Sequence, residues 1–338
     1  KFFHTVTSAW VIGAIFTVAV SAYYLLRNRE RKLAIESIKI GAIVGLTSSL
    51  LAALTGDNSA YLVSKVQPMK LAAMEALYNG GTDQSLTVVA CVNPFVQPDY
   101  VNQQKAPLRI GIPNVLSLLA TRSFHGYVPG VNNIINGYTL PDGSKEPSFA
   151  DKIASGKKAI VALANYRQAQ KYKNEAEAKA SLGVLRANMK YFGYGYVKST
   201  DQLVPFIPVC FWSFRIMVGL GFLFILFFAV VLYFVYRKDI AKLRWLLICA
   251  IVILPLGYIA SESGWIVAEM GRQPWTIQDM LPTWAAISDL QAGSVILTFF
   301  IFLVLFTTML VVEINILCKQ IKKGPEHSDN SQFTIHNS

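Results

Sequence analysis

Charged side chains are scarce in this 338-residue chain and make up only 15% of it. Hydrophobic residues reach 53% and the mean hydropathy is +0.41, a balance that is unusual for a water-soluble domain. The charges are also one-sided, because 31 lysines and arginines outnumber 20 acidic residues. A net charge of +11 indicates contact either with nucleic acid or with a membrane.

Cysteine and histidine are rare as well, with four of each. The cysteines form no Cys-x-x-Cys pair and no metal-ligand spacing, which excludes the common zinc and iron–sulfur motifs. We expect them to be small buried apolar residues, with a Cys91–Cys210 disulfide as the alternative. The chain also lacks an internal repeat, a glycine-rich phosphate loop and a nucleophile elbow, the signatures of solenoids, nucleotide-binding folds and α/β-hydrolases.

Long apolar runs are what the chain does have. Five segments approach or exceed the roughly 20 residues that a membrane-spanning helix needs. They are Val6–Leu26, Ile38–Leu54, Phe206–Tyr236, Trp245–Ala268 and Val295–Leu317. The second is the shortest, but Gly41 and Gly45 allow it to pack closely in a bundle. We therefore predict an all-α integral membrane bundle.

The basic residues cluster at three ends of these spans. The clusters are Arg27, Arg29, Arg31 and Lys32 after the first span, Arg237, Lys238, Lys242 and Arg244 after the third, and Lys319, Lys322 and Lys323 after the fifth. By the positive-inside rule all three lie in the cytoplasm, and the long loop lies outside. Charges that flank spans favour membrane contact over nucleic-acid binding, so no nucleic-acid partner is expected.

Four parts follow from this topology. They are two spans in 1–56, an external loop domain in 57–205, three spans in 206–318 and a cytoplasmic tail in 319–338. Within the loop domain, helical composition and periodicity mark Lys65–Tyr78, Val115–Arg122, Asp151–Lys173 and Glu175–Met189. The chain begins without Met and runs directly into a span, which we interpret as truncation rather than as a signal peptide.

One span carries ionisable residues at membrane depth. Glu262, Trp265, Glu269 and Arg272 are spaced three, four and three apart, which places them on one face of a helix. A buried charge in a bilayer costs several kcal/mol unless a partner offsets it, so this face predicts a functional site inside the protein.

Three further residues point to haem. Only His4 among the histidines lies in or beside a span, which excludes a cytochrome that needs histidine pairs within its spans. His4 is either hydrogen-bonded to polar groups at the membrane surface or an iron ligand. Met217 is either an apolar side chain of the packed core or an iron ligand. Arg215 at that depth requires a carboxylate, such as a haem propionate. By this topology His4, Met217 and Glu269 all lie toward the outer face, where a His/Met pair could hold haem iron.

The chain resembles subunit I of the bacterial cytochrome bd quinol oxidases over nearly its whole length. Gly264–Trp275 has that family's GW-x-x-x-E-x-GRQPW pattern. Lys1–Val6 resembles the start of its fifth transmembrane helix, and Phe214–Met217 the start of its seventh. Lys70–Glu75 resembles the KLAA-x-E motif of its external quinol loop. The resemblance implies that this chain is a C-terminal fragment without the first four transmembrane helices, inactive alone.

The resemblance also implies roles for the residues in the spans. His4 and Met217 would be axial ligands of the low-spin haem b558, and Glu269 would ligate the high-spin haem b595. Trp265 would lie between haems and assist electron transfer, and Glu262 is a candidate for the proton path. Arg215 and Arg272 would hold haem propionates.

In the loop domain, Lys70 and Glu75 would bind quinol, with Glu75 accepting its proton and releasing it outside. Five positions separate the two residues, about 140° on a regular helix, so a bent segment or a head group lying across the helix is required. Electrons would pass through the b haems to haem d, where O₂ becomes water and contributes to the proton motive force. The implied setting is a bacterial inner membrane, with a periplasmic loop domain, a second subunit and a small accessory subunit.

A second function class remains open from the residues alone. Glu262, Glu269 and Arg272 also fit an ion relay in a haem-free membrane transporter or receptor.

Overall fold

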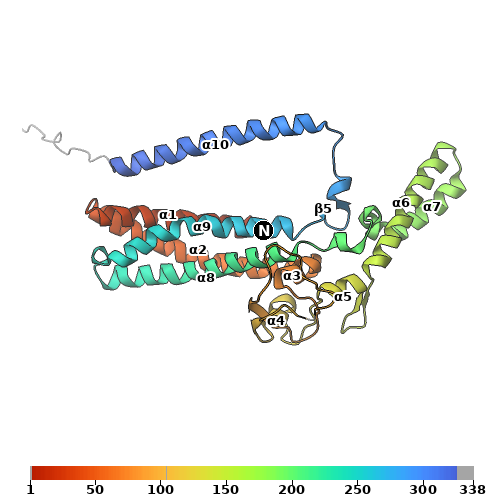
Figure 1. Ribbon diagram of the computed structural model, residues 1–338, viewed down its shortest axis with the longest axis horizontal. Coiled ribbons are helices and arrows are strands. Elements are labelled where there is room, and N and C mark those ends of the chain that lie inside the picture. The colour runs from red at the N-terminus through yellow and green to blue at the C-terminus, as the bar shows by residue number, and fades with distance from the viewer. Residues whose placement is uncertain (1, 104, 326–338) are drawn as a thin grey trace, which may run out of the picture.

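The computed structural model describes residues 2–103 and 105–325 (Figure 1). Its long helices are α1 (Phe2–Leu26), α2 (Arg31–Val66), α8 (Ile207–Arg237), α9 (Arg244–Met270) and α10 (Ala292–Lys323). Among the described residues, these five helices are long and apolar enough to cross a membrane. The predicted all-α membrane bundle is confirmed.

The connecting segments hold shorter elements. The α-helices are α3 (Pro68–Glu75), α4 (Val115–Thr121), α5 (Val131–Asn136), α6 (Phe149–Lys171) and α7 (Glu175–Asn188). The 3₁₀ helices are η1 (Met189–Tyr196), η2 (Thr200–Leu203), η3 (Ile240–Lys242) and η4 (Thr283–Ala285). Three antiparallel strand pairs accompany them, namely β1 (Leu86–Val89) with β2 (Ile110–Ile112), β3 (Tyr138–Thr139) with β4 (Lys145–Glu146), and β5 (Trp275–Ile277) with β6 (Leu281–Pro282). Figure 1 shows α3, α4 and α5 gathered at one end of the long helices, with the α6–α7 hairpin projecting beyond them.

Four of the long helices form the bundle. Helices α1 and α8 each pack against both α2 and α9, around a core of aliphatic and phenylalanine side chains. Small residues of α2 let the helices approach closely, as the sequence predicts. A Cβ at Gly41 would lie 3.1 Å from Val18 of α1, and one at Gly45 would lie 2.3 Å from the ring of Phe228 on α8.

The three basic clusters meet at the end of the bundle opposite the loop domain. Arg29 donates hydrogen bonds to the carbonyl oxygens of Lys322 and Lys323 at the end of α10, at 2.9 and 3.1 Å. Arg31 pairs with Asp239 between α8 and α9 at 2.6 Å. Their common location is the arrangement that a positive-inside topology requires.

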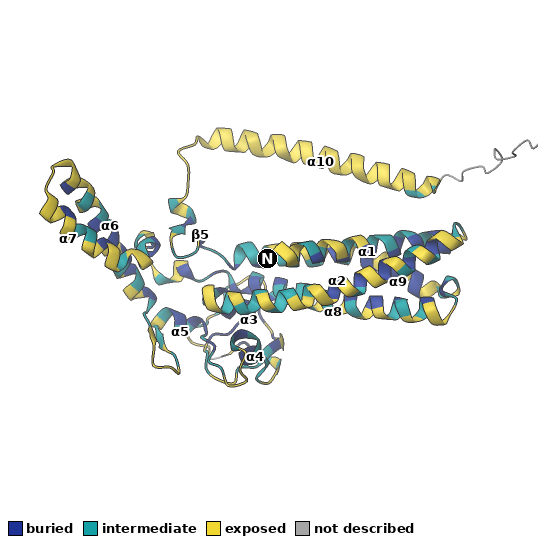
Figure 2. Ribbon diagram, turned by 180° about the vertical axis from the view of Figure 1, so that it is seen from behind, coloured by how far each residue is buried: buried dark blue, intermediate teal, exposed yellow. Residues whose placement is uncertain are grey.

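Helix α10 stands apart from the bundle along most of its length (Figures 1 and 2). No residue of α10 is buried, although the helix is the most apolar of the five candidate spans. Near its basic end, Ile321 packs against the bundle core and the Arg29 hydrogen bonds hold the last turn.

Two expectations are wrong. A single helix over Lys65–Tyr78 is not formed, because α2 ends at Val66 and Pro68 begins α3 after a break at Gln67; proline lacks the N–H that an uninterrupted helix needs at this position. All four cysteines are free, and only Cys210 is buried, while Cys91, Cys249 and Cys318 are exposed. Residues 326–338 of the predicted tail lie outside the described residues.

Candidate functional site

His4 lies near the loop-domain end of α1 and bonds to α2. Its Nδ1 is 3.0 Å from the carbonyl oxygen of Ala52 and 3.2 Å from Oγ1 of Thr55. A carbonyl oxygen only accepts, so Nδ1 carries the proton in this contact and Nε2 keeps its lone pair. Iron-ligating histidines are commonly oriented in this way, by a hydrogen bond from the other ring nitrogen.

Met217 lies on α8 and packs against a glycine of α9. A Cβ built at Gly264 would lie 2.9 Å from the Met217 sulfur, so the absence of a side chain there makes room for the thioether. His4 is 22 residues from the Leu26 end of α1, while Met217 and Gly264 are each 20 residues from the same end of α8 and α9. At 1.5 Å per residue these heights are about 33 and 30 Å, so His4 and Met217 lie at one level.

These donors fit a haem better than a bare metal ion. Among the described residues, no cluster of three histidine, cysteine or acidic side chains could hold an ion. A haem iron needs only one or two protein ligands, and an imidazole with a thioether is a suitable pair. Arg215 and Arg272 each have a buried Nε without a partner among the described residues, so both retain a donor for a carboxylate such as a propionate.

The acidic face of α9 lies at its loop-domain end. Glu262 and Trp265 are exposed, and Glu269 is half-buried and pairs with Arg272. Three of the four predicted residues share this helical face, but α9 ends at Met270. Arg272 therefore lies in the following turn and reaches back to Glu269. The described residues leave this face largely open.

Glu75 and Arg215 form a buried ion pair that the sequence does not predict. Arg215 donates from Nη2 to Oε2 at 2.7 Å and from Nη1 to Oε1 at 3.2 Å, and Glu75 is 1% exposed. Nη1 also donates to the carbonyl oxygen of Met74 at 2.9 Å. The guanidinium lies 4.5 Å from the centre of the Phe211 ring, a cation–π contact that adds to its attachment. Thus α3 of the loop domain is joined to α8 two residues before Met217.

The environment of Glu75 suits a proton acceptor. Burial raises the pKa of its carboxyl group, and the attraction of Arg215 and a hydrogen bond from the Thr87 amide oppose that rise. A carboxylate with a raised pKa is a stronger base than one in water.

Lys70 contacts α9, whereas Glu75 contacts α8. Its ammonium donates to the carbonyl oxygen of Ala268 at 3.2 Å, and its methylenes cover Gly271, where a Cβ would lie 2.8 Å from Lys70 Cγ. The positive charge therefore sits at the C-terminal end of α9, where the helix dipole favours it. Lys70 faces α9 and Glu75 faces α8, the divergence that five positions on a helix predict.

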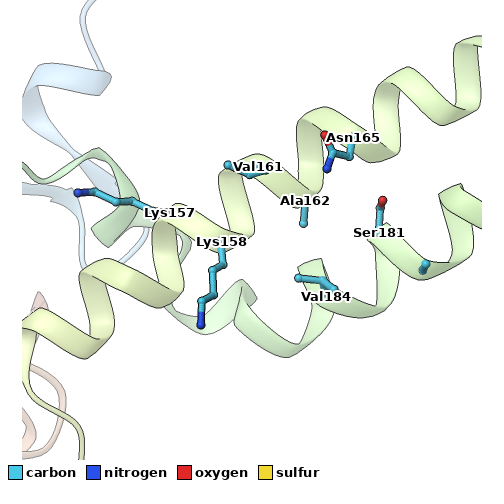
Figure 3. Close-up of a pocket in the computed structure, with 8 residues that line it drawn as sticks. Lys157, Lys158, Val161, Ala162, Asn165, Ser181 and Val184 are labelled. Carbon is cyan, nitrogen blue, oxygen red and sulfur yellow. The ribbon is translucent and has the colours of Figure 1, made fainter.

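Two cavities of the loop domain lie away from these residues. One of about 480 Å³ opens between α6 and α7, where Val161, Ala162 and Val184 form its apolar wall and Lys157 and Lys158 lie at its edge (Figure 3). A second, of about 310 Å³, is lined by tyrosines together with Glu146, Lys152 and Asp279. None of the predicted site residues lines either cavity.

Several partners of the site carry no signal in the sequence. Ala52 and Thr55 orient His4, while Thr87 and Arg109 lie beside Glu75. Gly264 is marked in the sequence only as part of a motif. Thr87 lies in the short strand β1 and Arg109 directly precedes β2, in a proline-rich region without clear periodicity, so no local pattern marks them.

The fold and this site define a helical membrane protein with five candidate spans among the described residues, a buried carboxylate at its loop domain, and an imidazole and a thioether at one height in its bundle. Comparison with known families is specific, because residues 1–325 match the model of cytochrome bd terminal oxidase subunit I. The chain belongs to this family.

Individual relatives agree with this assignment. The chain is 35% identical to the cytochrome bd-II ubiquinol oxidase subunit 1 of Escherichia coli over 99% of its own length and 64% of the relative's. It is 28% identical to the cytochrome bd ubiquinol oxidase subunit 1 of Bacillus subtilis, covering 99% of this chain and 58% of that protein. The chain thus spans about six-tenths of the length of these relatives.

A solved structure shows the same fold. The bd oxidase of Geobacillus thermodenitrificans superposes with a TM-score of 0.66 at 18% identity, covering 95% of this chain and 57% of that one.

Proposed function

We propose that this chain forms the quinol-facing, haem-ligating part of a quinol:oxygen oxidoreductase. The observation that carries the proposal is the buried Glu75–Arg215 pair, because it connects the loop domain to the helix of Met217. A proton acceptor and an iron ligand are thereby held on one rigid unit. Family membership supports this function over a haem-free transporter or receptor.

His4 and Met217 would hold the low-spin haem b558, and Glu269 would hold the high-spin haem b595. Bound haem supplies one-electron chemistry that side chains lack. Arg272 pairs with Glu269 and, with Arg215, retains a donor for a propionate. Trp265 would face the haems on the open side of α9, and Glu262 would serve a proton path there. Haem d would complete the set.

Glu75 would accept a proton from quinol, and Arg215 would hold the carboxylate in place while electrons leave. Lys70 would stabilise the end of α9 and approach the head group from the other side of α3. These two side chains diverge, so the head group would lie across α3 rather than beside one face of it.

The setting proposed for the whole protein is a bacterial inner membrane, with the loop domain in the periplasm and the basic ends in the cytoplasm. A second subunit and a small accessory subunit would assemble with it, and O₂ would be the electron acceptor. Proton release outside and uptake inside would contribute to the proton motive force.

Quinol-driven and dithionite-driven haem reduction in the purified full-length complex test this function. Glu75→Gln should slow reduction by quinol by about tenfold or more and leave reduction by dithionite unchanged, because only quinol must surrender a proton. Glu177→Gln, an exposed acid on α7, is the matched control. Equal quinol rates in both variants would contradict the assignment of Glu75.

A further inference from the structure

A β-hairpin of the loop domain lies against Glu75 and bonds to it through Thr87. The Thr87 amide donates to Oε2 of the carboxylate at 3.3 Å, and the Thr87 hydroxyl donates to the backbone carbonyl of Glu75, also at 3.3 Å. Thr87 is 3% exposed, so water does not compete for these contacts. One residue of β1 therefore holds both the side chain and the main chain of Glu75.

Arg109 in turn holds Thr87. Its Nε donates to the Thr87 hydroxyl oxygen at 2.8 Å, and its Nη2 donates to the carbonyl oxygen of Ser85 at 2.7 Å. Because the hydroxyl accepts from Arg109, its single hydrogen is directed to Glu75. Arg109 precedes β2, and the strands are close enough that a Cβ at Gly111 would lie 2.7 Å from the Leu86 carbonyl oxygen.

The guanidinium of Arg109 also adds charge near the carboxylate. Among the described residues, the charged groups that act on Glu75 are Arg215 from α8 and Arg109 from the hairpin. Lys70, on the same helix as Glu75, is bonded to the end of α9. Arg109 is partly buried and interacts electrostatically with both Glu75 and Arg215, so its charge is screened less than that of a surface arginine.

We propose that Arg109 and Thr87 are positioning residues for proton acceptance at Glu75, so that the β1–β2 hairpin is part of the quinol-oxidising site. Arg109 orients the Thr87 hydroxyl, Thr87 fixes the carboxylate against Arg215, and the second cation favours the ionised form that can accept a proton. This role rests on the proposed function of Glu75. Neither residue touches the reacting atoms.

The pH dependence of quinol oxidation by the full-length complex tests this role. Arg109→Gln and Thr87→Val should move the acidic limb of the kcat/KM profile to higher pH by up to about one unit, because loss or displacement of a nearby cation favours the protonated carboxyl group. Arg109→Lys keeps the charge and Thr87→Ser keeps the hydroxyl, so both should lie near the wild-type profile. Arg122→Gln, at an exposed pair with Asp57, is the matched control.

Haem content measured from the dithionite-reduced spectrum shows that each variant has folded. If Arg109→Gln does not assemble, the comparison of the kcat/KM profiles of Thr87→Val and Thr87→Ser tests the proposal. Profiles of Arg109→Gln and Thr87→Val that coincide with Arg122→Gln would overturn the proposal.

A second readout separates this role from the proposed function. The infrared carboxylate band of Glu75, assigned by its loss in Glu75→Gln, should shift in Arg109→Gln and Thr87→Val. If Glu75→Gln oxidises quinol normally, Glu75 is not the acceptor and the proposed function fails there. An unshifted band in both hairpin variants refutes positioning even when Glu75 is essential.

Discussion

Substitution of Gly264 by alanine should disturb Met217 from outside its own helix. The new Cβ would lie 2.9 Å from the Met217 sulfur and 3.7 Å from its Cγ. Ordinary contact begins near 3.4 Å, so the sulfur must retreat by about 0.5 Å. Overpacking of this kind costs about 1–3 kcal/mol, while replacing a helical glycine by alanine returns up to about 1 kcal/mol.

Gly219 supplies the control for this experiment. It lies on α8 two residues after Met217, and a Cβ there meets nothing within 4 Å. Gly219→Ala should therefore be neutral or stabilising by about 0.5–1 kcal/mol, which puts the two variants about 1–3 kcal/mol apart. Thermal unfolding of the detergent-solubilised complex measures this difference.

The spectrum reports whether the sulfur is an iron ligand. A retreat of the thioether weakens an axial bond, so Gly264→Ala should lose part of the low-spin signal and lower the midpoint potential, because methionine ligation raises it. In a Met217→Ala background, the added effect of Gly264→Ala should vanish, since the two sites are coupled only through contact. Gly264→Ala and Gly219→Ala variants with equal stability and equal spectra would refute this reasoning.

Three other predictions follow from single contacts. Quinol oxidation should fall as pH decreases through a pKa above the ordinary carboxyl range, because burial raises the pKa of Glu75 and a protonated acid accepts no proton; the limb should be absent from the residual activity of Glu75→Gln. Gly45→Ala should destabilise the protein by about 1–3 kcal/mol in thermal unfolding, because its Cβ would lie 2.3 Å from Phe228, whereas Gly13→Ala meets nothing within 4 Å; equal melting temperatures would contradict the packing. Arg31→Gln should cost less than about 1 kcal/mol in the same assay, since its pair with Asp239 is solvent-exposed.

Patterns of local origin were predictable from the sequence. Apolar length marks each span, and small residues such as Gly41 and Gly45 mark close packing, because both properties depend on residues near in the chain. The 3.6-residue period correctly groups Glu262, Trp265 and Glu269. It fails at Arg272, because α9 ends at Met270 and no cap is visible in the sequence.

Long-range pairing could not be predicted in the same way. Glu75 and Arg215 are 140 residues apart. A periodic pattern depends on neighbouring residues, so it cannot identify which distant charge pairs with a buried one. The depth of Arg215 in its span therefore predicts a propionate partner, whereas the structure gives it a carboxylate from the loop domain. The positions of Thr87 and Arg109 depend on the pairing of two strands of four and three residues. Strands this short show no recognisable alternation of polar and apolar residues.

The reduced-minus-oxidised spectrum of the full-length complex carrying Met217→Leu tests the central claim most directly. Leucine has no sulfur, so the low-spin haem b signal should be replaced by a high-spin signal, while the haem assigned to Glu269 stays bound. Met309→Leu, on the exposed surface of α10, should keep the wild-type spectrum. A low-spin signal that persists unchanged in Met217→Leu would contradict the assignment of this methionine as an iron ligand.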